Sequence, residues 1–187
     1  MTYTTPIFGT IPTLGIDLST SGYDQPYTVS TSTPEYPQQP FSVGQVITMT
    51  NGGEAIYVTT ATATGITQGN FVYINSANAA AGLTSAIAAT AGQTARLGVA
   101  LCTLTTGQFG WVQTNGYNAY GVTVTTAAAA NATLHTSATA GVLTTAVVTG
   151  TSFPINNIAT TTTSAATAGA YPCVMNNPII NTATPLG

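Results

Sequence analysis

The sequence predicts an all-β protein: a compact antiparallel sandwich or barrel, jelly-roll-like or similar, preceded by an extended N-terminal arm. Charged residues make up only 3% of the 187 residues and lysine is absent, so long helices would lack the charged outer face that keeps them in water. About 40 residues are threonine, whose branched side chain favours strands. Short apolar runs bounded by turn residues recur roughly every 8 to 12 residues, which is typical of sandwiches and barrels.

Residues 1–40 are the predicted arm. They contain six of the ten prolines, three of the four acidic residues and no alanine. Proline at this density removes backbone donors and favours extended segments over helices or central strands. The aromatic and apolar side chains of the arm need a surface to cover them, either a neighbouring molecule or the arm's own domain. The candidate contact residues in the arm are Tyr3, Ile7, Phe8, Tyr23, Tyr27 and Tyr36.

Residues 41–187 are the predicted β-rich domain. Strands are expected where β-branched and aromatic residues lie between turn residues. The predicted strands are residues 43–49, 55–60, 71–74, 95–102, 109–114, 121–125, 133–136, 141–145, 158–163 and 170–174. Asn-Gly sequences at residues 51–52 and 115–116 accept positive φ, so each predicts a tight turn that ends a strand.

Two alanine-rich stretches interrupt the strand pattern. Residues 77–91 carry no charge for a water-facing helix side, so an irregular segment with at most one or two helical turns is expected. Residues 127–130 are four consecutive alanines, too few to nucleate a helix alone.

The sequence offers little for catalysis. His135 is the one side chain with a reference pKa near neutrality, and three of the four acids that could orient it lie in the arm. No nucleophile elbow, phosphate-binding loop or dinucleotide fingerprint occurs. His135 is therefore predicted to be a structural strand residue, and we expect no enzyme, no cofactor and no metal site.

Glu54, Arg96 and Trp111 each have two interpretations. Glu54 and Arg96 are the only formal charges of the domain, either a buried or interfacial ion pair or two independent solvated groups. Trp111 is most simply a core residue, or else an aromatic anchor in a subunit interface. Cys102 and Cys173 lie in apolar surroundings and are expected to be buried free thiols.

Composition also limits the classes of partner that the chain is expected to bind. The formal charge is −3, and Arg96 alone cannot neutralise a row of phosphates, so no nucleic-acid partner is expected. No run approaches the ~18 apolar residues of a membrane helix, and no membrane partner or secretory signal is expected. Interface cores are depleted of Lys, Glu and Asp, so this composition favours a component of an assembly.

Four segments, in this order, resemble the head decoration (cement) proteins of tailed bacteriophages. They are residues 53–58, 97–100, 109–116 and 131–143. The resemblance covers roughly residues 45 to 145 and leaves out the arm and the threonine-rich C-terminal part. It implies a small β-fold, commonly a homotrimer, on the outer surface of the capsid in the virion. There it would bridge neighbouring subunits of the major capsid protein.

Two other functions fit parts of the pattern. A carbohydrate-binding or adhesive module would use exposed tyrosine and tryptophan together with asparagine and glutamine donors. An ice-binding protein would need regularly spaced Thr-x-Thr rows, and the threonines here show no fixed period. The carbohydrate-binding module is therefore the main alternative to the decoration protein.

Overall fold

The computed structural model describes residues 41–49, 52–60, 65–91, 95–148, 151–161 and 169–181. The predicted arm, residues 1–40, lies outside these described residues. Strands dominate the described chain, so the all-β prediction is confirmed. The elements are β1 (Val46–Thr48), β2 (Glu54–Thr60), β3 (Phe71–Ile74), β4 (Ala79–Gly82), α1 (Ser85–Ala91), β5 (Arg96–Ala100), β6 (Phe109–Val124), β7 (Leu134–Thr136), β8 (Leu143–Thr144), β9 (Pro154–Thr160) and β10 (Gly169–Ile180).

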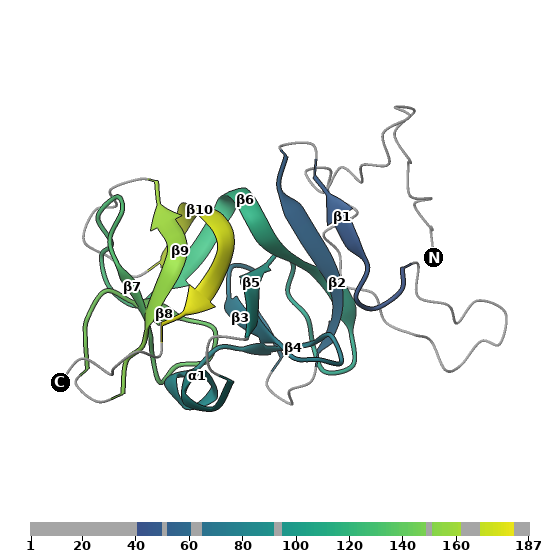
Figure 1. The fold of residues 1–187 in the computed structure, drawn as a ribbon, viewed down its shortest axis with the longest axis horizontal. Helices are drawn as coiled ribbons and strands as arrows, with labels where there is room; N and C mark the ends of the chain where they lie inside the picture. The colour runs from purple at the N-terminus through teal and green to yellow at the C-terminus, as the bar shows by residue number, and fades with distance from the viewer. Residues whose placement is uncertain are drawn as a thin grey trace, which may run out of the picture.

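The strands form one hydrogen-bonded sheet that closes on itself twice. The first ring runs β2-β4-β3-β5-β6 and returns to β2, and the second runs β6-β10-β9-β7-β8 and returns to β6. Figure 1 shows β6 crossing between the β1–β2 side of the molecule and the β9–β10 side. The fold is therefore two closed barrels that share one long strand, with β1 paired outside the first ring to β2.

The number of strands in each ring explains a departure from the predicted antiparallel sheet. A closed ring of five strands cannot alternate direction all the way round, so at least one neighbouring pair must be parallel. The first ring has its parallel pair at β2–β4, and the second has its parallel pair at β6–β8. All other pairings in the rings are antiparallel.

The turn predicted at residues 115–116 is wrong, because β6 continues through it. Asn115 pairs with Glu54 of the first ring on one edge and with Asn176 of the second ring on the other. Gly116 has φ of 90°, a left-handed value that suits glycine. The same local signal therefore produces a bend inside a strand instead of a hairpin turn.

The bend in β6 is fixed from both sides. The Gln113 side chain is buried, and its Nε2 donates hydrogen bonds to the carbonyls of Asn115 (2.9 Å) and Tyr117 (3.0 Å). A Cβ at Gly116 would lie 2.5 Å from Gly53 Cα. The backbone of Gly116 thus packs against that of Gly53, the residue before β2, and leaves no room for a side chain.

Each ring encloses its own core. Alternate side chains from all strands of the first ring meet in one cluster that includes Ile56, Val72, Ala100 and Val112. The interior cluster of the second ring continues onto the outer side of β3 and β5 through Phe71. The two barrels are consequently packed against each other as well as joined through β6.

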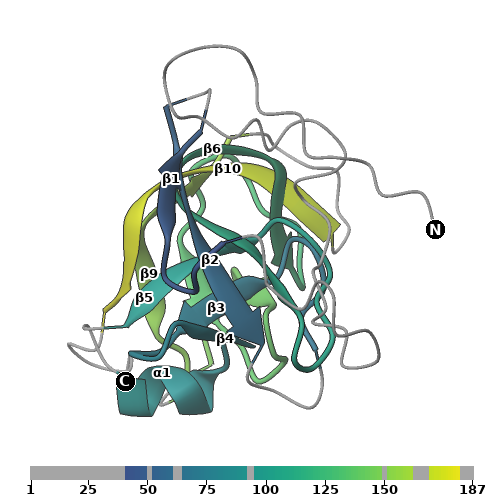
Figure 2. The same ribbon diagram turned by 90° about the vertical axis from the view of Figure 1, so that its right-hand side faces the viewer.

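The alanine-rich stretch divides into a strand and a helix. Residues 79–82 form β4, which the sequence did not indicate, whereas α1 has the two helical turns allowed by the prediction. Thr84 Oγ1 accepts a hydrogen bond from the Ile87 amide (3.1 Å) as an N-terminal cap. Ser85 N donates to the Ser137 carbonyl at 2.9 Å, which ties the helix to the chain following β7. Figure 2 shows α1 at one end of the molecule, beside β4.

Most of the other predicted strands are confirmed, with shifted ends. Residues 71–74 form β3 as predicted, and the hairpins β1–β2, β5–β6 and β7–β8 have antiparallel registers. Asn51 of the predicted first turn lies outside the described residues. The alanines at residues 127–130 form no helix. β9 begins earlier than expected and β10 extends further, to Ile180.

Candidate functional site

Two neighbouring strands of the second barrel, β6 and β10, expose large apolar side chains. Tyr117 on β6 is the direct cross-strand partner of Val174 on β10, and they are 47% and 45% exposed. Tyr120 on β6 and Ile179 on β10 are also exposed. Because the inner side chains of this ring are in its core, these four lie on its outside. We call Tyr117, Tyr120, Val174 and Ile179 the neutral face.

The strands that carry and flank the neutral face have no formal charge. β6, β9 and β10 contain no Asp, Glu, Lys, Arg or His. Val174 is flanked on β9 by Ala159, a small side chain that leaves the Tyr117–Val174 pair prominent. Burial of such a surface away from water is favourable in free energy, and the surface neither attracts nor repels a charged partner.

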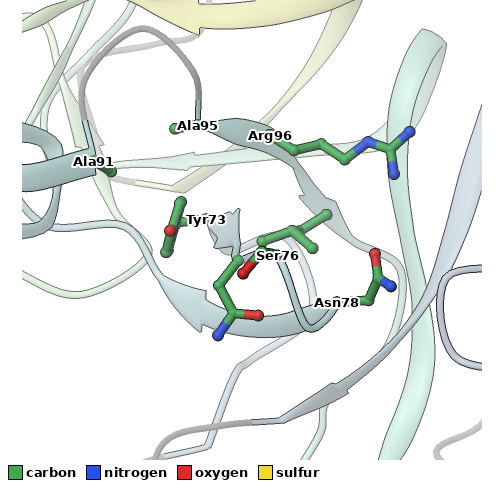
Figure 3. Close-up of a pocket in the computed structure, with 8 residues that line it drawn as sticks. Tyr73, Ser76, Asn78, Ala91, Ala95 and Arg96 are labelled. Carbon is green, nitrogen blue, oxygen red and sulfur yellow. The ribbon is translucent and has the colours of Figure 1, made fainter.

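A polar pocket lies on the first barrel, and none of its lining residues belongs to β6, β9 or β10. It has a volume of about 360 Å³, and its lining includes Tyr73, Ser76, Asn78 and Arg96. Figure 3 shows Arg96 extended along one side of the pocket, with Ser76 and Asn78 on another. The lining contains no acidic side chain, so this pocket presents hydrogen-bond donors and one positive charge.

Glu54 and Arg96 do not form the ion pair considered from the sequence. Glu54 begins β2 and Arg96 begins β5. β6 runs between these strands, pairing with β2 on one edge and with β5 on the other, so the two charges are held apart. Within the described part of the chain, no ion pair involves either residue. The interpretation as two separate charges is the one that the structure supports.

Trp111 occupies the core position that its sequence surroundings favoured. It is 1% exposed, and its ring centroid lies 5.0 Å from that of Tyr57 and 5.1 Å from that of Phe41. This leaves almost no indole surface for a partner. The six other predicted contact residues lie outside the described residues; they are Tyr3, Ile7, Phe8, Tyr23, Tyr27 and Tyr36.

His135 is a strand residue, as predicted, and the structure shows that it is also buried. It lies in β7, opposite Thr144 of β8 and Pro154 of β9, and is 5% exposed. Burial lowers its pKa below the usual value, with a smaller opposing effect from a hydrogen bond to the Thr144 backbone. Its Nδ1 has no hydrogen-bond partner in the described structure. Among the described residues, no carboxylate forms a hydrogen bond with His135 that would orient the imidazole as in a catalytic triad.

The two cysteines are buried free thiols, which confirms the prediction. Burial raises the pKa of Cys173 to about 12, against a smaller lowering effect from a hydrogen bond with the Val122 backbone. The Cys173 thiol is therefore protonated at neutral pH and a weak nucleophile. Among the described residues, no group of three or more His, Cys, Asp or Glu side chains could hold a metal ion. No helix in that part of the chain is long and apolar enough to cross a bilayer.

Comparisons with known proteins leave the function to be argued from these features. No family model matches the chain. A search of curated proteins and a search of solved structures also find no match.

The neutral face is the surface that sequence reasoning missed. Val174 and Ile179 belong to an alternating strand pattern, which shows that one side is buried but not which side meets water. Ring closure decides that question, because it places one side of each strand inside. Tyr117 and Tyr120 lie near Trp111 in the sequence. The sequence does not show, however, that these two tyrosines are exposed while Val122 of the same strand is buried.

Proposed function

We propose that this chain is a structural protein of the virion, a capsid decoration or cement protein. It binds the outside of a bacteriophage head as a homotrimer, bridges subunits of the major capsid protein and stabilises the shell. The observation that carries the proposal is the neutral face: exposed Tyr117, Tyr120, Val174 and Ile179 on β6 and β10, two strands without a charged residue, with the equally uncharged β9 beside β10. The sequence resemblance to decoration proteins supports the same function.

The neutral face has the chemistry of a protein interface. Aromatic residues are enriched and charged residues depleted at the centres of such contacts. The neutral face lies on regular strands of a closed barrel that shares β6 with the other barrel. Its residues are therefore already ordered before binding, and little conformational entropy is lost when the face binds. Because β6 and β10 belong to a closed ring and each has a neighbour on both edges, the proposed contact is the neutral face and not an edge of these strands.

Stabilisation of the shell follows from selective binding. A protein that binds the assembled shell and not its dissociated subunits shifts the equilibrium toward the shell by mass action. No catalytic chemistry is required, in agreement with the buried His135 and the protonated Cys173. The chain acts mechanically, by bridging neighbours.

A carbohydrate-binding or adhesive module remains the alternative, since Tyr117 and Tyr120 are exposed rings on which a sugar could stack. Binding of the soluble protein to a glycan array, with loss on Tyr117→Ser, would favour that function. The decoration proposal predicts no glycan signal.

The proposal is tested with a matched pair of variants. Tyr117→Ser combined with Val174→Thr should reduce co-sedimentation with empty shells of the phage that carries this chain by at least tenfold. Val46→Thr is the control, because Val46 on β1 is equally exposed (47%) but lies on the other barrel. Unchanged binding by the double variant, or equal loss in the control, would contradict the role of the neutral face. Light scattering of the wild-type protein should give three times the chain mass of 18.8 kDa.

A further inference from the structure

We propose that the pocket beside Arg96 is a carboxylate-binding site whose occupant is an acidic side chain of residues 1–40. The shell-binding proposal involves the neutral face on the other barrel, so this inference is independent of it.

The pocket is equipped to hold a carboxylate. Arg96 is exposed, and within the described residues its guanidinium has no ion pair. A planar guanidinium can donate two parallel hydrogen bonds to one carboxylate. Tyr73, Ser76 and Asn78 add hydroxyl and amide groups to the lining. The rest of the lining includes the apolar Ile74, Ala91 and Ala95, and it contains no carboxylate that would repel a second one.

Asn75 adds a hydrogen-bond donor to this lining. Its Oδ1 already accepts hydrogen bonds from the amides of Ala77 (2.9 Å) and Ala79 (3.0 Å). These bonds fix the turn between β3 and β4 and leave the Nδ2 group of Asn75 for a ligand. The pocket volume of about 360 Å³ lies at the small end of the ~300–1,000 Å³ range of ligand sites, and it suits one side chain better than a large ligand.

Charge complementarity identifies the occupant. The chain has one basic residue and four acidic ones. Glu54, the acid within the domain, is separated from Arg96 by β6. The other three acids, Asp17, Asp24 and Glu35, all belong to residues 1–40. In the sequence, three of the four acidic residues thus precede residue 41, whereas the one basic residue follows it.

The start of the described chain lies next to the pocket. A Cβ added at Gly44 would lie 2.5 Å from Asn78 Nδ2, so the backbone of Gly44 touches a residue of the pocket lining. Glu35 precedes Gly44 by nine residues, which can span up to about 30 Å when extended. A tether of this length allows Glu35 to reach the pocket, and tethering raises its effective concentration there.

The experiment uses Arg96 as its own probe. Because the chain contains a single arginine, full-length protein labelled with ¹⁵N-arginine gives one guanidinium Nε signal. If a carboxylate binds, this signal should shift as the acid is protonated, at pH values near or below the reference range of about 4. The shift should vanish in the triple variant Asp17→Asn, Asp24→Asn, Glu35→Gln, and it should persist in the control Glu54→Gln.

Two results would overturn the inference. One is an Arg96 signal that does not move across this pH range. The other is a shift that survives the triple variant, whether it is lost on Glu54→Gln or tracks added acetate. All measurements use isolated protein without shells, so failure here and failure of the decoration proposal are separate outcomes.

Discussion

His135 makes the stability of the fold depend on pH. Burial lowers its pKa in the folded state below the 6.5 of the exposed group, so between these two values the unfolded chain binds more protons than the folded one. Stability is then fully present above about pH 6.5 and decreases as the pH falls toward the folded-state pKa. The melting temperature should therefore fall from pH 7.5 to pH 5.5, roughly the window of this titration.

The variant His135→Gln isolates this effect. Carboxyl groups titrate mainly below about pH 5, and the chain has no other histidine. The melting temperature of the variant should vary less with pH in this window, whatever its absolute value. An equal slope in both proteins would show that His135 is not the group responsible.

At the scale of elements, the bend in β6 is the feature on which both barrels depend. Gly116→Ala should destabilise the protein by at least about 2 kcal/mol, because the left-handed backbone strains alanine and the new methyl meets Gly53 Cα. Gly169→Ala is the matched control, since that glycine lies in β10 with open space around its Cβ position. Urea denaturation measures both, and a loss below 0.5 kcal/mol at Gly116, roughly the size of an ordinary surface substitution, would contradict this role for the bend.

The same bend shows what sequence patterns can predict. β3 was predicted with its observed ends because Phe71–Ile74 is a compact run of β-branched and aromatic residues between turn signals. Asn115-Gly116 has the local preference of a turn, but its outcome depends on β10, which is distant in sequence and pairs with β6 on both sides of the glycine. β4 consists of alanines and glycine, which have little strand preference, so tertiary pairing alone makes it a strand.

Some features of the candidate sites could likewise be predicted from neighbouring residues in the sequence, and others depend on how the strands pair. The burial of Cys102 and Cys173 could be predicted, because their neighbours in the sequence are apolar. For His135 the sequence predicted a structural strand position, but not that the side chain would be buried. The separation of Glu54 from Arg96 could not be predicted, since it depends on which strands flank β6. The neutral face likewise exists only after ring closure has decided which side of β10 meets water.

For the whole molecule, low charge is the property that links fold and function. The described domain carries Glu54 and Arg96 as its formal charges, and the neutral face carries none. Binding through this face should therefore be driven by apolar burial, which salt does not screen. An ionic interface, in contrast, weakens as the screening length falls to about 3 Å near 1 M salt.

Co-sedimentation of the wild-type protein with empty shells at low salt and at about 1 M NaCl tests the central claim most directly. The decoration proposal predicts saturable binding at low salt, with no more than about a twofold loss at high salt, because the contact is apolar. Protein that stays in the supernatant at low salt, or that leaves intact shells at high salt, would contradict it.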